Sequence, residues 1–299
     1  MNTSLMNDRA LGAYLGFAIG DALGATVEFM TPGEIAAKYG SHCRIVGGGW
    51  LKLKAGEVTD DTEMTLCVGD AIINAGGWDV HAVCEGFSQW LRSVPADVGN
   101  TCRRGIRRYI HDGTVATPLN EGDAGNGACM RNLPVALATL NDPVAFRQWT
   151  LEQCHTTHNH PLSDAATLAI GRMVQRLVKG GGVSDCREEA QALIEAQPNF
   201  RFDRYNGLCT PFIVDTIRTV LHFYFLTDSV RSCIIETVNV GGDADTAGAL
   251  AGMLSGATYG AKSIPASWLR TIDKRVVADI KEQVPALLKI SNMHSAQSA

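Results

Sequence analysis

Two acidic clusters lie far apart in the chain, at residues 59–62 (TDDT) and 241–246 (GGDADT), and each precedes an apolar stretch with helical periodicity. Asp and Thr are good helix caps, and carboxylates are favoured near a helix N-terminus, so capping explains either cluster taken alone. Capping needs only one side chain, however, whereas each cluster supplies two carboxylates and at least one hydroxyl. Because so much negative charge is costly without a compensating cation, the two clusters together indicate a metal site.

The donor atoms of these clusters indicate which metal they suit. Carboxylate and hydroxyl oxygens are hard ligands that favour Mg²⁺ or Mn²⁺, and neither cluster contains the His or Cys that favours zinc. Two clusters that face each other can hold two ions, which orient the oxygens of a substrate and lower the pKa of a bridging water. The residues alone leave open whether the clusters meet.

A glycine-rich loop occupies residues 121–128 (EGDAGNGA), directly before a segment with helical character. Backbone N–H groups ahead of a helix can cradle a diphosphate. The loop is neither a Walker loop, because no GK[ST] follows, nor a Rossmann fingerprint, because no strand is predicted before it. A plain turn with an Asn cap explains it equally well.

Three histidines crowd into residues 154–160 (CHTTHNH), just before a proline. Without metal-spaced cysteines or an HExxH frame they do not indicate zinc. Hydrogen bonding to a ligand, with His158 as the candidate, competes with histidine placed at a helix C-terminus, where the dipole favours positive charge. The sequence has no GxSxG elbow and no catalytic-cysteine signature, so we set nucleophilic triads aside.

Charge and cysteine usage exclude further classes. The chain has 26 Lys+Arg against 31 Asp+Glu, a net charge of −5, and no basic stripe, which argues against a general nucleic-acid binder. Its nine cysteines show no metal or disulfide spacing, so we interpret them as core thiols of a cytoplasmic protein. No signal peptide and no apolar run near the ~20 residues that span a bilayer is apparent, which leaves peripheral membrane contact open.

Helical periodicity dominates the elements that must position these residues. We predict an all-α, compact single domain over residues 1–290 and a frayed tail at 291–299, with a short strand possible within 43–53. Expected N-caps are Asp79, Asp142, Ser163 and Ser184. The predicted helices cover about 9–28, 61–75, 79–92, 101–111, 127–139, 143–154, 163–179, 185–196, 212–226, 229–239, 245–259 and 276–289.

The first of these helices carries glycines at four-residue spacing, Gly12, Gly16, Gly20 and Gly24. Such a face suits the close approach of another helix or of a ligand, and close packing is the simpler explanation. Asp21 and Glu28 are two turns apart on the same helix, so both can point to one side, although two solvated surface acids explain them as well.

Taken together, these motifs resemble the ADP-ribosylglycohydrolase family in order and in spacing. The likeness covers roughly residues 9–260, and it is carried by GDALG at 20–24 with Glu28, TDDT at 59–62, GNGA at 125–128 with MR at 130–131, and GGDADT at 241–246. It implies a compact helical fold with two divalent cations, Mn²⁺ or Mg²⁺, that hydrolyses ADP-ribose from a modified protein side chain. Ala244 stands where many relatives have a polar residue, which should matter little.

The resemblance also implies roles for individual residues. Glu28 would lie beside the metals as a ligand or as the base that orients water, and Asp60 and Asp61 would act with it in catalysis. The metal ligands would be Thr59, Asp60 and Asp61 for one ion, and Asp243, Asp245 and Thr246 for the other, with Asp245 as a bridge. The ribose and diphosphate would be held by Asn100, Glu121, Gly122, Asp123, Gly125, Asn126, Gly127 and the nearby His158.

The likeness is strongest to members that act on arginine of the nitrogenase iron protein, dinitrogenase reductase. A cationic guanidinium leaving group needs an anionic neighbour, and we assign that role to Asp97 from its loop position and charge. By resemblance, a PII-type signalling protein and a membrane ammonium channel are possible regulatory partners. Alternatives are hydrolysis of another linkage, to serine or an O-acetyl ester, a non-catalytic ADP-ribose-binding protein, and a phosphate-binding regulator.

Overall fold

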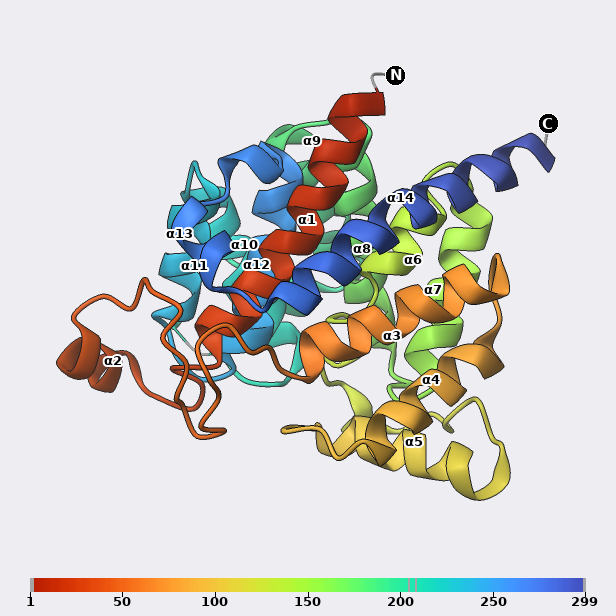
Figure 1. The fold of residues 1–299 in the computed structure, drawn as a ribbon, viewed down its shortest axis with the longest axis horizontal. Helices are drawn as coiled ribbons and strands as arrows, with labels where there is room; N and C mark the ends of the chain where they lie inside the picture. Colours follow the sequence, from red (N-terminus) through yellow and green to blue (C-terminus); the bar gives the residue numbers. More distant parts are fainter. Residues whose placement is uncertain (1–2, 204, 208, 298–299) are drawn as a thin grey trace.

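The computed structural model describes residues 3–203, 205–207 and 209–297, and this part of the chain contains helices but no named strand. Two isolated β-bridges, Gly48 with Leu53 and Gly125 with Phe212, are present. Figure 1 shows the helices gathered into one body. The α-helices are α1 (Thr3–Gly24), α2 (Pro32–Tyr39), α3 (Asp60–Ala75), α4 (Val80–Arg92), α5 (Asn100–Asp112), α6 (Leu133–Ala138), α7 (Pro143–His155), α8 (Pro161–Val178), α9 (Val183–Ala196), α10 (Ile213–Leu226), α11 (Val230–Val238), α12 (Ala244–Tyr259), α13 (Ala266–Thr271) and α14 (Lys274–Gln297).

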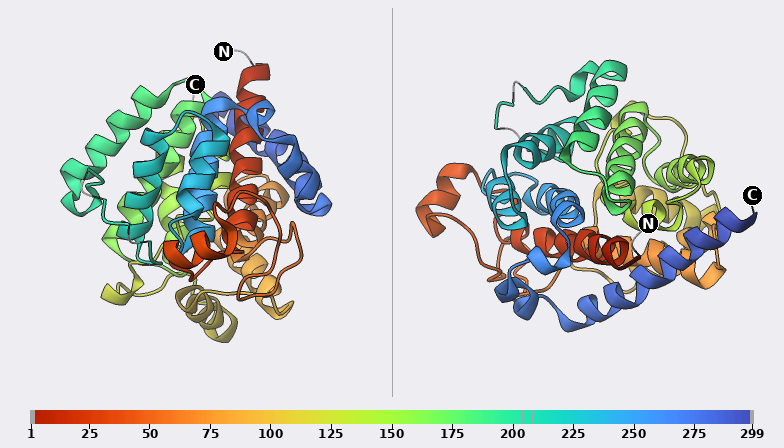
Figure 2. Two further views of the ribbon diagram at one scale, coloured as in Figure 1. Left: turned by 90° about the vertical axis from the view of Figure 1, so that its left-hand side faces the viewer. Right: turned by 90° about the horizontal axis from the view of Figure 1, so that it is seen from above.

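The glycine face of α1 packs directly on α12, as close packing predicts. The facing pairs are Gly12 with Gly256, Gly16 with Gly252, Gly20 with Gly248, and Gly24 with Ala244. A Cβ atom on Gly20 would lie 2.0 Å from the carbonyl oxygen of Gly248, so only glycine fits there. The pairs run in opposite order, which makes the helices antiparallel and sets the C-terminal end of α1 beside the N-terminal end of α12. Figures 1 and 2 show the two helices side by side in the middle of the molecule.

Most predicted helices are present, and the differences have local causes. The helix expected over 127–139 begins at Leu133, because residues before it form turns. The first helix ends at Gly24 rather than at residue 28, so Glu28 lies in the turn that follows. The segment 43–53 forms only the Gly48–Leu53 bridge. Two short helices, α2 and α13, were not predicted.

Two of the four expected N-caps are confirmed. Asp79 and Asp142 each accept hydrogen bonds from two backbone N–H groups at the starts of α4 and α7. The other two expectations, at Ser163 and Ser184, are wrong. Proline at the first helical position starts α8 earlier, so His160 is its cap. Gly182 precedes α9, and its N–H donates to the Asp185 carboxylate at 2.7 Å.

The long helix α14 packs across α1, α3 and α6 on the outside of the molecule (Figure 2). It continues to Gln297, past the predicted end at residue 289 and through most of the segment that we expected to fray. Residues 298–299 of that segment lie outside the described residues. Among the described helices, none combines the length and the apolar character needed to cross a membrane.

Candidate metal centre and substrate cavity

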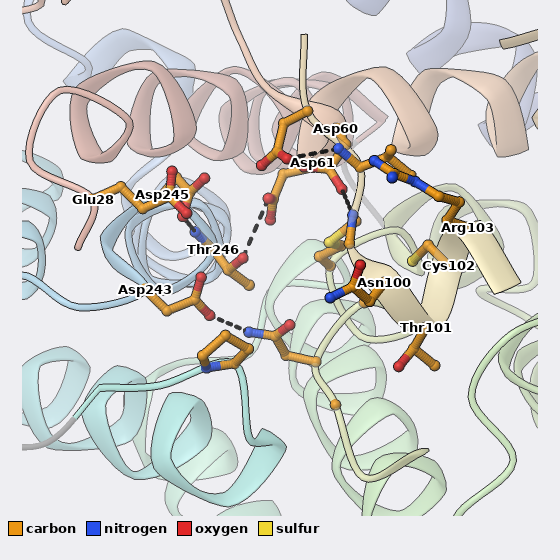
Figure 3. A pocket seen from close by; sticks show the side chains of 18 of the residues that line it. Glu28, Asp60, Asp61, Asn100, Thr101, Cys102, Arg103, Asp243, Asp245 and Thr246 are labelled. Carbon is orange, nitrogen blue, oxygen red and sulfur yellow. Dashed lines mark hydrogen bonds between the residues drawn. The ribbon is translucent and has the colours of Figure 1, made fainter. Parts of the chain in front are cut away.

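Several helix starts and loops converge on one cavity of about 490 Å³. The contributors are the N-terminal ends of α3, α5 and α12, the turn after α1 and the loop before α6 (Figure 3). The lining residues are Glu28, Phe29, Trp50, Asp60, Asp61, Asp97, Val98, Gly99, Asn100, Thr101, Cys102, Arg103, Gly125, Asn126, Gly127, Met130, His158, Pro211, Asp243, Asp245 and Thr246.

The first acidic cluster is held in shape by Asp21, a fully buried residue of α1. Its carboxylate accepts hydrogen bonds from the N–H groups of Thr59 and Thr62, each at 3.1 Å, and from the Thr62 hydroxyl at 2.5 Å. Thr59 caps α3 by accepting from the Asp61 N–H. Thr59 and Asp21 therefore accept the hydrogen bonds of the backbone N–H groups at the start of α3. The carboxylates of Asp60 and Asp61 are not needed for this capping, and they face the cavity. The interpretation of Asp21 as a solvated surface acid is wrong, because the residue is buried and its hydrogen bonds position the cluster.

The second acidic cluster is positioned by backbone contacts. Gly241 and Gly242 have φ values of 72° and 62°, which favour glycine. A Cβ atom on Gly242 would lie 2.0 Å from the carbonyl oxygen of Cys209. Gly242 also donates its N–H to Met30 at 2.9 Å and accepts from the Phe29 N–H at 2.7 Å. These bonds tie the turn before α12 to the segment that carries Glu28.

The two clusters meet in the cavity. The Thr246 hydroxyl donates to Asp61 at 3.2 Å across 185 residues of sequence. One carboxylate oxygen from each of Glu28, Asp243 and Asp245 lies within 4.8 Å of the others. Figure 3 shows Glu28 beside Asp245, with Asp60 and Asp61 on the neighbouring wall. The structure thus brings together all the residues named as ligands, with Thr59 behind Asp61 and hydrogen-bonded to it at 3.3 Å.

Burial sets the electrostatics of this cluster. Removal from water, with repulsion from neighbouring acids, raises the pKa of Glu28 to about 8 and that of Asp60 to about 7. Burial also raises the pKa of Asp243 to about 6, and that of Asp61 and Asp245 well above the usual value. In the described part of the chain, Oδ1 of Asp61 is buried with no hydrogen-bond partner. An oxygen-rich cluster with an orphaned carboxylate oxygen fits a hard divalent cation.

Trp50 is a further cavity residue, which sequence reasoning missed. Its indole N–H donates to Oε2 of Glu28 at 2.5 Å, and its ring lies 5.3 Å from that of Phe29, centroid to centroid. A lone tryptophan in a loop belongs to no motif, so no local pattern could have indicated this contact.

The second half of the glycine-rich loop lines the cavity, and His158 packs beneath it. Cβ atoms on Gly125 and Gly127 would lie 2.9 Å and 2.7 Å from the His158 ring, so glycine allows the close approach. Nδ1 of His158 lies 2.7 Å from the Thr157 hydroxyl. Burial, with the charges of Arg131 and Arg104, lowers the pKa of His158 well below its usual value, which keeps the ring neutral.

The first half of that loop does not line the cavity, contrary to our expectation for Glu121, Gly122 and Asp123. These residues form a 3₁₀ turn whose cap is the Asn120 side chain. The Glu121 side chain is 98% exposed, and Asp123 forms an ion pair with Arg104. The ion pair holds Asp123 to Arg104 of α5, and solvent surrounds the Glu121 side chain.

Asp97 and Asn100 both lie in the cavity wall, as expected. Burial raises the pKa of Asp97, whereas the charge of Arg103 acts in the opposite direction. The N–H of Gly99 donates to the Asp60 carboxylate at 3.3 Å, which joins this loop to the first acidic cluster. Among the described lining residues, Arg103 carries the one permanent positive charge.

The three crowded histidines have three separate surroundings, so they do not form a metal cluster. His155 lies 3.0 Å from the Asp164 carboxylate, and His160 caps α8 by accepting from the Leu162 N–H at 3.1 Å. His158 alone lines the cavity.

Comparison with known proteins agrees with this geometry. The chain is 58% identical to the "ADP-ribosyl-[dinitrogen reductase] glycohydrolase" of Rhodospirillum rubrum, over 96% of this chain and 98% of that protein. It is 30% identical to "ADP-ribosylarginine hydrolase Tri1" of Serratia proteamaculans, over 93% of this chain and 79% of the relative. A solved structure described as "ADP-ribosylglycohydrolase-related protein complex" superimposes with a TM-score of 0.84 at 29% identity, covering 96% of this chain and 99% of that one.

A family model described as ADP-ribosylglycohydrolase matches residues 1–296, which is nearly the whole chain. The match includes both acidic clusters and the glycine-rich loop that meet in the cavity. The chain belongs to the ADP-ribosylglycohydrolase family.

Proposed function

We propose that the chain is a metal-dependent hydrolase that releases ADP-ribose from a modified arginine of a protein, with dinitrogenase reductase as its target. The observation that carries this proposal is the meeting of two acidic clusters, through Thr246 and Asp61, in one buried cavity. The names of the Rhodospirillum and Serratia relatives support arginine as the linkage and the nitrogenase protein as the target.

The charge of the cavity supports two divalent cations. Six carboxylates line it, from Glu28, Asp60, Asp61, Asp97, Asp243 and Asp245, and Arg103 offsets only one of them. Asp60 and Asp61, with Thr59 behind them, would hold one ion, and Asp243, Asp245 and Thr246 the other, with Asp245 as the bridge. When bound, the cations supply positive charge that orients the ribose oxygens and activates water. Mn²⁺ and Mg²⁺ suit these oxygen donors equally.

The remaining cavity residues fit the steps of glycoside hydrolysis. The bond from C1″ to the guanidine nitrogen breaks as the oxygen of water adds to C1″. One proton of that water passes to the departing nitrogen, which leaves as the guanidinium of arginine, and the other stays on the new C1″ hydroxyl. Glu28, held by Trp50, orients the water. Asp97 lies where an anion can face the cationic leaving group, and the surrounding carboxylates limit repulsion of the developing oxocarbenium charge.

The diphosphate fits the glycine-rich half of the loop. Gly125, Asn126 and Gly127 line the cavity, the two glycines leave room for a ligand to approach the backbone, and Asn100 lies in the same wall. Asn126 also donates to the Asp243 carboxylate, which links the substrate loop to the second acidic cluster. The His158 ring packs against Gly125 and Gly127 and, being neutral, adds no charge to the loop. A PII-type partner and peripheral membrane contact stay predictions.

The test is release of ADP-ribose from arginine-ADP-ribosylated dinitrogenase reductase by metal-stripped chain to which Mn²⁺ or Mg²⁺ is returned. Proteins modified on serine, and O-acetyl-ADP-ribose, are assayed in parallel. We expect metal-restored release from the arginine linkage and little from the others. Release from serine or the ester alone contradicts the linkage, and binding of ADP-ribose without release from any substrate contradicts the enzymatic role.

A further inference from the structure

A second hollow adjoins the catalytic cavity and has no role in the chemistry described above. It is an open groove of about 700 Å³ between the turn after α1, the loop that carries Trp50, and α2. Glu28, Phe29 and Trp50 line both hollows, so the groove lies directly beside the catalytic cavity. Figures 1 and 2 place α2 at the outer edge of the molecule, where a large partner has access.

The groove displays apolar side chains that the fold does not cover. Phe29 is 60% exposed and Trp50 is 50% exposed, and their rings form one tilted pair at the boundary between the hollows. Met30 and Ala37 continue the apolar lining, and Lys38 contributes a charge. Exposed aromatic side chains that adjoin a functional cavity are typical of sites that bind another macromolecule.

The backbone at this boundary is held in an unfavourable conformation. Phe29 has a φ of 62°, in the left-handed region that bulky residues avoid. Its N–H is fixed by the carbonyl of Gly242, so the second acidic cluster imposes this conformation. Residues held in such conformations are frequent at functional sites. Because the Phe29 ring is exposed, its packing within the chain does not offset the backbone strain.

The floor of the groove also contains a polar atom without a partner. Thr26 is buried and lines the groove, and its hydroxyl makes no hydrogen bond within the residues that the structure describes. Buried hydroxyls are normally paired, so this unpaired group marks the groove lining as incompletely satisfied by the fold itself. A polypeptide offers polar backbone groups at every residue, together with apolar side chains for the aromatic pair.

We propose that this groove binds the segment of the protein substrate that flanks the modified arginine. The inference rests on the proposed function, because an ADP-ribosylarginine in the cavity must be attached to a polypeptide that leaves it. Glu28 lines the groove and also lines the catalytic cavity together with Asp97, the residue assigned to the leaving group. The polypeptide therefore emerges beside Phe29 and Trp50, and the groove selects protein-bound over free ADP-ribosylarginine.

The test compares kcat/KM on ADP-ribosylated dinitrogenase reductase with kcat/KM on free ADP-ribosyl-L-arginine, using the metal-loaded full chain. Ala37→Glu places bulk and charge in the groove from the exposed face of α2, at a residue that does not line the catalytic cavity. Lys38→Glu reverses the charge of an exposed residue that lines the groove but not the catalytic cavity. Leu226→Ala, at a 67% exposed side chain outside both hollows, is the matched control.

We expect each groove variant to lower the ratio of the two kcat/KM values by about tenfold, mainly through KM for the protein, because the added bulk or reversed charge removes contacts with the bound segment. The control should keep the wild-type ratio. An unchanged ratio in both groove variants overturns the proposal. An equal loss of kcat/KM on both substrates also overturns it, because it shows that the groove residues act on the ADP-ribose itself. A change of oligomeric state in light scattering overturns it in favour of a contact between copies. If wild type releases ADP-ribose from neither substrate, the proposed function fails instead.

Discussion

The two acidic clusters contain similar residues but are positioned by different means. The cluster at residues 59–62 is shaped by one side chain, the buried Asp21, which accepts three hydrogen bonds from it. The cluster at 241–246 is shaped by glycines whose backbone lies against other backbone, with no room for a side chain. The stability of the first cluster should therefore be sensitive to a change of charge at Asp21. That of the second should be sensitive to a change of side-chain volume at its glycines.

The largest expected effect comes from adding a methyl group to the backbone-held cluster. In Gly242→Ala, the new Cβ lies 2.0 Å from the Cys209 carbonyl oxygen at a φ of 62°. We expect a loss of about 3 kcal/mol in the free energy of unfolding, since overpacking and strain add, measured by urea denaturation.

Gly113→Ala is the matched control, because Gly113 has a φ of 75° but open space around it. In Gly113→Ala the free energy of unfolding should fall by about 1 kcal/mol, which is the cost of the backbone strain alone. Equal losses in the two variants would show that the backbone contact at Gly242 contributes nothing beyond its dihedral angle.

The next largest effect is expected for Asp21→Asn in the side-chain-held cluster. The amide keeps the shape of the carboxylate but cannot accept all three hydrogen bonds. We expect a loss of about 2 kcal/mol in stability and about thirtyfold in metal-restored activity, because Asp60 and Asp61 lose their orientation. Urea denaturation and ADP-ribose release measure the two effects.

Asp79→Asn is its control, because Asp79 also accepts from two backbone N–H groups but caps the exposed start of α4. It should keep full activity. Full activity in Asp21→Asn as well would contradict the role of Asp21 in positioning the cluster.

Apart from these substitutions, an effect of pH is expected on the stability of the metal-free chain. The pKa of Asp60 is about 7 in the folded chain against an ordinary 3.8, and that of Glu28 is about 8 against 4.5. The folded chain therefore binds more protons than the unfolded chain across this window, so its stability falls as pH rises, by about 1.4 kcal/mol per pH unit for each proton of difference.

Thermal melts at pH 5.5 and 8 measure this dependence. The metal-free Tm should be lower at pH 8, Asp60→Asn should reduce the difference, and saturating Mn²⁺ should raise Tm more at pH 8 than at pH 5.5. If the Tm of the metal-free chain instead rises from pH 5.5 to pH 8, and Asp60→Asn shows the same difference, the buried acids are not the source of the pH dependence.

The smallest effect is expected where the clusters touch. Thr246→Val removes the hydroxyl that donates to Asp61 but keeps the shape of the side chain. Stability should change by about 1 kcal/mol, while the Mn²⁺ concentration for half-maximal activity rises about tenfold. Thr237→Val, at a buried threonine of α11 that bonds to the Cys233 carbonyl, is the control. Identical Mn²⁺ dependence in both variants would separate Thr246 from the metal centre.

The sequence predicted what local patterns encode. The helix α3 starts at a motif whose Thr59 caps it, whereas Asp243 precedes α12 without a side-chain cap bond. The glycine face of α1 indicated its close packing with α12. The helix α2 was missed although its start carries a capping box, Thr31 with Glu34, because eight residues give too short a period to recognise.

The missed features of the site are contacts between distant segments. Trp50 reaches Glu28 from another loop, and Asp21 reaches the cluster at 59–62 from a different helix. Glu121 and Asp123 were placed in the substrate site because the loop was read as one unit. The turn capped by Asn120 and the ion pair of Asp123 with Arg104 of α5 separate the first half of the loop from the second.

The central claim is that the two clusters together form one dinuclear centre, and metal stoichiometry tests it most directly. Metal-stripped chain is titrated with Mn²⁺ by calorimetry while ADP-ribose release is followed, for wild type, Asp61→Asn and Asp243→Asn. We predict two ions per wild-type chain, activity only when both are bound, and loss of at least one ion in each variant. A wild-type chain that binds one ion or none at full activity, or variants that still bind two, would contradict the claim.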